Sequence, residues 1–169
     1  MSKPIFPELR SSVNRKVLRA LWVKSPLSVK EIAKETNLVE QAVSRALSQL
    51  SKRVFIKSDY ERGETGKGVK KMNRPSMCFF YIDLAARFGK KITDEEMDAI
   101  DSLFIETEIK DRVGKAMSYF LGCPDHGGVM VIAKVLTEDI NEYYKKPEMK
   151  EKMETVYKIQ ERILPKRPF

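Results

Sequence analysis

The sequence feature that most constrains the fold is a pair of amphipathic segments in residues 27–50. Ser28 and Glu31 stand three residues apart, the spacing of a capping box, in which each side chain accepts a hydrogen bond from the other residue's backbone N–H at a helix start. Asn37 follows the first segment, and asparagine is one of the few residues that tolerate a left-handed backbone. The segment therefore predicts two short helices joined by a tight turn at Asn37.

The second segment has one apolar side and one polar side. Its apolar residues recur at helical spacing and predict a buried face: they are Ala42, Val43, Ala46, Leu47 and Leu50. The opposite side carries hydrogen-bonding side chains of the kind that reach base edges and phosphates in DNA. Among these, Arg45 is the first candidate for a base contact, to guanine, and Gln41 is the second. The alternative is that both helices belong to an ordinary helical core.

The positive charge is confined to the half of the chain that contains this segment. Residues 1–75 hold 17 Lys and Arg against 7 Asp and Glu, a net charge of +10. Residues 76–169 hold 15 against 17, a net charge of −2. Such an asymmetry favours a nucleic-acid partner for the first half.

The spacing in residues 27–50 resembles the helix-turn-helix superfamily. That pattern favours Ala at its fifth position, a turn residue at its ninth and Ile or Val at its fifteenth. Counted from Val29, these positions are Ala33, Asn37 and Val43. Ala33 and Val43 fit the pattern, whereas Asn37 stands where Gly is usual. The resemblance implies that the second helix, residues 39–51, enters the major groove. The residues of this helix that we expect to face DNA are Val39, Glu40, Gln41, Ser44, Arg45 and Ser48.

The residues after this helix extend the resemblance. Residues 54–57 and 77–82 are rich in β-branched and aromatic side chains and predict two strands, with a polar, glycine-rich loop at 61–68 between them. Helix, helix, strand, loop and strand resemble the winged helix-turn-helix of the MarR-like and ArsR-like transcriptional regulators, in which the hairpin wing lies along the DNA backbone. With a preceding helix around residues 13–21, we expect a DNA-binding domain over residues 8–84.

Basic side chains are concentrated in the predicted wing, residues 59–75, and at the end of the second helix. Lys and Arg in such positions neutralise phosphates and release counterions, which gives affinity without sequence preference. The alternative is a solvated surface loop. The candidate phosphate contacts are Lys52, Arg53, Arg62, Lys67, Lys70, Lys71 and Arg74.

Two other motifs are weak. Residues 63–68 superficially resemble a nucleotide-binding loop, but the Ser or Thr that must follow its lysine is replaced by glycine. Cys123, Asp125 and His126 lie close together, yet a structural zinc site needs four ligands from two separated pairs, so we expect a turn between helices. We therefore expect no metal, no cofactor and, for want of a nucleophile with its base, no enzyme.

The second half of the chain, residues 92–164, predicts a helical assembly region. Apolar residues recur at helical steps in 93–121, with Gly114 a candidate kink, and again in 129–144 and 148–164. Three helices beside one small domain have limited apolar surface to cover, and pairing with a second copy is the simple solution. The sequence therefore favours a symmetric homodimer. An intramolecular three-helix bundle stays open, and so does a ligand pocket in place of ordinary core packing.

The sequence thus predicts a mainly α fold with a small β-hairpin wing (α+β), a winged helix-turn-helix followed by a dimerisation region. The expected function is a homodimeric transcriptional regulator that binds specific double-stranded DNA, with no membrane partner and a small-molecule effector left undefined. Two cysteines and no apolar leader favour the cytoplasm. The alternatives are a winged-helix subunit of a transcription or replication assembly, and a sequence-neutral architectural protein of the chromosome.

Overall fold

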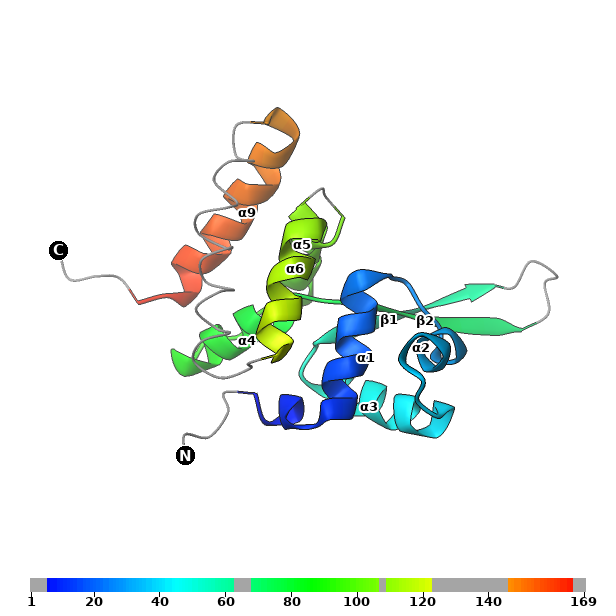
Figure 1. Cartoon of the computed structure of the whole chain (residues 1–169). Coiled ribbons are helices and arrows are strands. Elements are labelled where there is room, and N and C mark those ends of the chain that lie inside the picture. The colour runs from blue at the N-terminus through cyan, green and yellow to red at the C-terminus, as the bar shows by residue number, and fades with distance from the viewer. Residues whose placement is uncertain (1–5, 63–67, 107–108, 123–145, 166–169) are drawn as a thin grey trace. The chain divides into compact units, whose positions relative to one another are not determined.

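The computed structural model describes residues 6–62, 68–106, 109–122 and 146–165 (Figure 1). The chain packs as two units, the first made of residues 1–75 with 114–132 and the second of residues 76–113 with 133–169. The described part is mainly helical and holds one antiparallel two-stranded sheet. The predicted fold class is confirmed.

The first unit contains a short 3-10 helix, three α-helices, the sheet and the second half of another helix. These elements are η1 (Pro7–Arg10), α1 (Ser12–Val23), α2 (Val29–Thr36), α3 (Glu40–Lys52), β1 (Ile56–Arg62), β2 (Val69–Pro75) and α6 (Ile109–Gly122). The predicted helix before the pair is α1, and the predicted pair is α2 and α3. All three predictions are confirmed. The core of the unit is apolar and includes Leu9, Val17, Leu18, Leu21, Trp22, Ile32, Val43, Leu47, Leu50 and Phe55.

The turn between α2 and α3 has the local structure that its residues predict. The Ser28 hydroxyl accepts from the Glu31 N–H at 3.3 Å, and the Glu31 carboxylate accepts from the Ser28 N–H at 3.3 Å. This capping box satisfies two backbone donors that the first turn of α2 would otherwise leave unpaired. Asn37 ends α2 with a φ of 59°, the left-handed conformation that turns the chain sharply into α3.

Polar contacts hold the surrounding elements to this pair. The buried Asn14 side chain on α1 donates to the Gln49 side chain on α3 at 2.8 Å. Leu27, just before α2, pairs with Asn73 of β2 through N–H···O=C bonds of 2.9 and 2.8 Å in the two directions. The start of α2 is therefore tied to the sheet, and the sheet lies at a defined position beside the two helices.

The wing differs from the prediction in its second strand. β1 and β2 pair in register from Ile56 with Pro75 to Arg62 with Val69, so the strands cover most of residues 58–76, the stretch between the two predicted strands. The first strand starts two residues later than expected and runs farther. The predicted returning strand at 77–82 is wrong, because these residues lie mostly in a helix, α4 (Cys78–Arg87).

A buried carboxylate explains why residues 77–82 are helical. Asp101 accepts from the Met77 N–H at 3.1 Å and from the Ser76 hydroxyl at 3.0 Å, and that hydroxyl accepts from the Cys78 N–H at 3.0 Å. These contacts satisfy donors at the start of α4. A short apolar run is compatible with either a strand or a buried helix, and here a residue far along the chain decides.

The second unit contains α4, α5 (Asp94–Phe104), the first half of α6 and α9 (Pro147–Ile163). The predicted helix at 148–164 is confirmed as α9. The single helix predicted at 93–121 is wrong, since α5 ends at Phe104 and α6 begins at Ile109. The predicted helix at 129–144 and the predicted turn at 123–128 lie outside the described residues.

Gly114 has a packing role inside α6 where the sequence suggested a kink. A Cβ added to Gly114 would lie 3.3 Å from the carbonyl oxygen of Trp22, closer than ordinary van der Waals contact. The missing side chain therefore lets α6 approach the end of α1 closely. Phe120, farther along α6, packs edge-on against Phe6 with ring centroids 5.9 Å apart.

Candidate nucleic-acid interface

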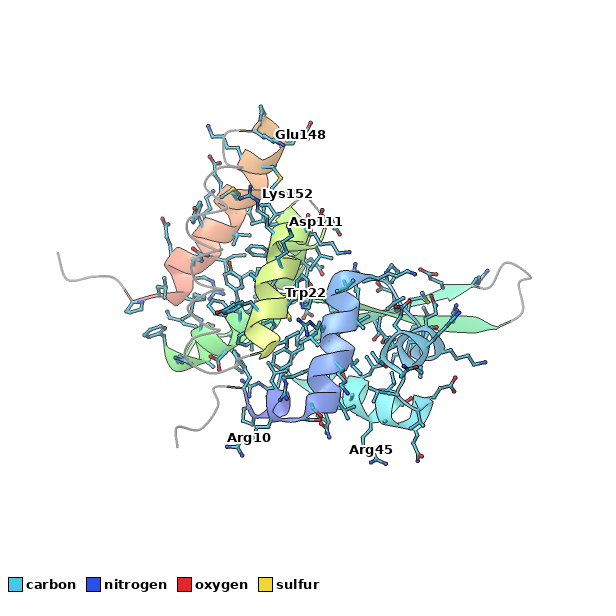
Figure 2. The ribbon with its side chains drawn as sticks, viewed as in Figure 1. Arg10, Trp22, Arg45, Asp111, Glu148 and Lys152 are labelled. Carbon is cyan, nitrogen blue, oxygen red and sulfur yellow. The ribbon has the colours of Figure 1, made fainter. Side chains whose placement is uncertain are left out.

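The exposed side of α3 carries the predicted base-contacting residues. Val43, Ala46, Leu47 and Leu50 are buried, so the opposite side of the helix faces solvent. Val39 is the N-terminal cap of α3 and is 70% exposed. Figure 2 shows Arg45 reaching outward from α3. The exposed residues of this side are Val39, Glu40, Gln41, Ser44, Arg45 and Ser48.

A groove of about 300 Å³ lies between α3 and the wing. Three serine hydroxyls of α3 line one wall, and the other wall comes from the two wing strands and the start of α2. Hydroxyls and a lysine ammonium are donors of the kind that position phosphate oxygens. The lining residues are Val29, Ser44, Leu47, Ser48, Ser51, Ile56, Ser58 and Lys71.

The strand register divides the wing into two faces. Residues paired across an antiparallel sheet share a face, and neighbours along a strand lie on opposite faces. Ile56, Ser58 and Lys71 line the groove beside α3, and the register places them on the same face. This face, here called the groove face, consists of Ile56, Ser58, Tyr60, Arg62, Val69, Lys71, Asn73 and Pro75. The other, here called the outer face, consists of Lys57, Asp59, Glu61, Lys70, Met72 and Arg74.

Two of the predicted phosphate contacts are held by carboxylates. Lys70 Nζ lies 3.1 Å from the Glu31 carboxylate, and Arg74 Nε lies 3.3 Å from the Asp59 carboxylate. Both cations belong to the outer face. In the part of the chain that the structure describes, Arg62 and Lys71 on the groove face make no ion pair. All four cations were expected to contact phosphates, but the structure places two of them on each face of the wing.

The two basic residues at the end of α3, Lys52 and Arg53, differ in the same way. Lys52 is exposed. Arg53 lies 3.4 Å from the Glu8 carboxylate, and its guanidinium lies over the Phe6 ring, 5.6 Å from the ring centroid. These contacts give Arg53 a structural role, through charge pairing and a cation–π interaction. Lys67, the last predicted wing contact, lies outside the described residues.

Glu31 is a titratable residue of α2 whose carboxylate contacts Lys70 of the wing. The Ser28 hydroxyl, followed by Lys70, lowers the pKa of Glu31 from its ordinary value by stabilising the charged carboxylate. Glu31 therefore stays ionised beside the wing. Its negative charge offsets the positive charge of Lys70 on the outer face. Lys71, the other lysine of β2, lies on the groove face.

A second groove borders α3 on the side of α1. It measures about 200 Å³ and is lined mostly by small and polar side chains. Arg45 lines this groove, whereas Ser44 lines the groove beside the wing. The exposed side of α3 is therefore flanked by a concave surface on each side. The lining residues are Ser11, Val13, Asn14, Ala42, Arg45, Ala46 and Gln49.

Four residues of this surface were not predicted from the sequence. Ser51 and Ser58 line the groove, and Tyr60 and Val69 stand exposed on the groove face. The alternation of the residues that precede the loop could have identified Tyr60. That reasoning required the strand to extend to Arg62, and the prediction ended it at residue 57.

The described residues carry two further findings. No three side chains of the Cys, His, Asp or Glu type gather there in a geometry that could hold a metal ion. Each described helix is too short or too polar to cross a membrane. Cys123, Asp125 and His126, which the sequence placed in a turn, lie outside the described ranges.

Comparison with known protein families identifies the type of domain that contains α3. Residues 10–54 match the family model for winged helix-turn-helix DNA-binding domains. No curated protein matches the chain. The matched residues include α1, α2 and α3, and the hairpin of β1 and β2 follows them directly. Residues 10–54 are therefore a helix-turn-helix of the winged, DNA-binding type.

Proposed function

We propose that this protein is a transcriptional regulator that binds specific double-stranded DNA as a homodimer. In this proposal α3 enters the major groove, and the groove face of the wing lies along the adjacent phosphates. The observation that carries the proposal is the groove between α3 and the wing, where Ser44, Ser48 and Ser58 stand beside Lys71. It joins the exposed side of α3 to Lys71, which makes no ion pair with any residue that the structure describes.

The exposed residues of α3 have two different roles in this proposal, because some contact bases and others contact phosphates. Arg45 can donate two parallel hydrogen bonds to a guanine, and Gln41 can pair with an adenine. The hydroxyls of Ser44 and Ser48, together with Lys71, would position the DNA backbone without reading sequence. Val39, at the start of α3, would supply an apolar contact to a thymine methyl group. Lys52 and Arg62 are proposed as further phosphate contacts.

The dimer is the part of the proposal that concerns the second half of the chain. One winged domain of this size covers a single half-site, and two copies related by twofold symmetry would present two α3 helices to an inverted repeat. Residues 76–169 carry a net charge of −2, so repulsion between copies is weak there. We propose the helical region, residues 92–164, as the contact between copies.

The decisive experiment is selection of bound duplexes from a random pool, with light scattering on the same sample to measure mass. The function predicts enrichment of an inverted repeat and the mass of a dimer. Binding without enrichment would favour a sequence-neutral architectural protein. Absence of duplex binding at moderate salt, with other polypeptides co-purifying, would favour a subunit of a larger assembly.

A matched pair of variants makes this selection sharper. Arg45→Ala removes an exposed cation from α3 and should change the enriched sequence at one position. Lys90→Ala removes an exposed cation from the segment after α4, which the proposal does not use, and should enrich the same sequence as the unaltered protein. An unchanged selection with Arg45→Ala would contradict the proposed role of α3.

A further inference from the structure

Tyr60 is the most exposed aromatic side chain among the residues that the structure describes, at 70%. It stands near the outer end of β1, opposite Lys71 of β2. Val69, another exposed apolar side chain of the wing at 63%, pairs with Arg62 two positions away. Single exposed apolar residues are common, but here two share one face of a two-stranded hairpin.

The surroundings of Tyr60 distinguish it from an ordinary surface tyrosine. The groove face carries Arg62 and Lys71 and no acidic residue in either strand, whereas the outer face carries Asp59 and Glu61. The face is also continuous with the groove beside α3, because Ser58 and Lys71 belong to both. An aromatic ring between two cations matches the surface of a nucleic acid, in which apolar sugars alternate with phosphates.

We propose that Tyr60 is a DNA contact that works through its ring. The ring would pack on the deoxyribose surface at the edge of the minor groove, while Arg62 and Lys71 hold the phosphates on either side. Val69 would extend the apolar contact. This inference rests on the proposed DNA-binding function and adds a kind of contact that the basic residues do not provide.

The contact has a measurable signature. Each phosphate neutralised by a cation releases counterions, so its contribution falls as the salt concentration rises. Burial of a ring against a sugar releases no counterions. Removal of the Tyr60 ring should therefore weaken binding by a similar factor at every salt concentration.

The test measures the affinity of full-length protein for a fluorescein-labelled, random-sequence duplex by anisotropy over a series of KCl concentrations. Tyr60→Ser should weaken binding by about tenfold, the effect expected for loss of a partly buried ring, with an unchanged salt slope. Tyr60→Phe keeps the ring and should bind like the unaltered protein. Phe88→Ser is the matched control, since Phe88, just after α4, is 42% exposed and lies neither on the wing nor in residues 92–164.

The outcomes separate this inference from the function beneath it. If the unaltered protein binds the duplex and Tyr60→Ser binds equally well, the inference is wrong and the proposed function stands. A reduced salt slope in Tyr60→Ser would also contradict it, because the variant would then have displaced a cation. If the unaltered protein does not bind DNA at low salt, the proposed function fails and this contact fails with it. Thermal unfolding of each variant confirms that the wing change leaves the fold intact.

Discussion

Lys70 Nζ of β2 lies 3.1 Å from Oε1 of Glu31, the residue that closes the capping box of α2. The same oxygen accepts a hydrogen bond from the Ser28 hydroxyl at 2.8 Å. One carboxylate thus joins the start of α2 to the wing. Lys71, the next residue along, points to the opposite face and lines the groove beside α3. Two adjacent lysines therefore have different surroundings.

This difference predicts unequal effects on DNA binding. Lys71→Gln should weaken binding to any duplex and should lower the slope of log K against log salt by about 1, because one phosphate contact is lost. Lys70→Gln should leave the slope nearly unchanged, because Lys70 is already paired with Glu31. Filter binding or anisotropy over a salt series measures both. Equal loss of slope in the two variants would show that both faces of the wing contact DNA.

Arg45 should govern preference among sequences. Arg45→Ala should weaken the selected site by about 1–3 kcal/mol, the value of a bidentate contact to a base. Binding to random duplex should change much less, because the base contact is specific and the phosphate contacts remain. Competition between the two duplexes gives both numbers in one experiment. If both duplexes lose the same factor, Arg45 contacts a phosphate.

Asn37 should govern the stability of the turn between α2 and α3. Its φ of 59° is left-handed, and a Cβ without a local hydrogen-bonding group makes that conformation unfavourable by about 1–2 kcal/mol. Asn37→Ala should lower the free energy of unfolding by about 1 kcal/mol. Asn37→Gly should leave it unchanged or raise it, because glycine has no Cβ. Urea unfolding measures both variants, and an equal loss in the two would assign the effect to side-chain contacts.

Glu31 should make stability depend on acid pH. Its pKa is lower in the folded protein than its ordinary value, so its contribution is fully present above that value and is lost as the pH falls through the folded-state pKa. Glu31→Gln removes the titration. The unaltered protein should exceed Glu31→Gln in stability at neutral pH, and the difference should shrink below about pH 4.3, the ordinary Glu pKa. A difference that stays constant from neutral pH into acid would contradict this.

Asp101 should stabilise the start of α4. It is buried and accepts from the Met77 N–H at 3.1 Å and the Ser76 hydroxyl at 3.0 Å. Asp101→Ala should lower the free energy of unfolding by about 2–3 kcal/mol, since it leaves buried donors unpaired. The exposed Glu95 on the same helix is the control, and Glu95→Ala should have a much smaller effect. Chemical denaturation of both variants makes the comparison.

The helix pair and its turn could be predicted because their signals are local. The capping box of Ser28 and Glu31, the left-handed Asn37 and the apolar spacing of α3 all act within a few residues of the chain. Such short-range patterns give the start, end and buried side of a helix without knowledge of the tertiary structure. The exposed side of α3, and with it the candidate base contacts, followed directly.

The second strand of the wing could not be predicted in the same way. β2 is rich in lysine and is exposed over its first three residues, so it lacks the apolar alternation of a typical strand. The more apolar run that follows it is a helix because Asp101, more than twenty residues later, caps it. The division of the wing cations into two faces depends on the register of the two strands, which the sequence alone does not specify.

The two faces of the wing allow binding and rigidity to change independently. A substitution at Tyr60, Arg62 or Lys71 alters what the hairpin can touch, while the Lys70–Glu31 and Arg74–Asp59 pairs that brace it remain. Related proteins could therefore change their DNA target by substitutions on the groove face while the ion pairs on the outer face stay the same. For the same reason, a fluorophore attached to the outer face at Glu61 would report on DNA binding from a position that the binding itself does not need.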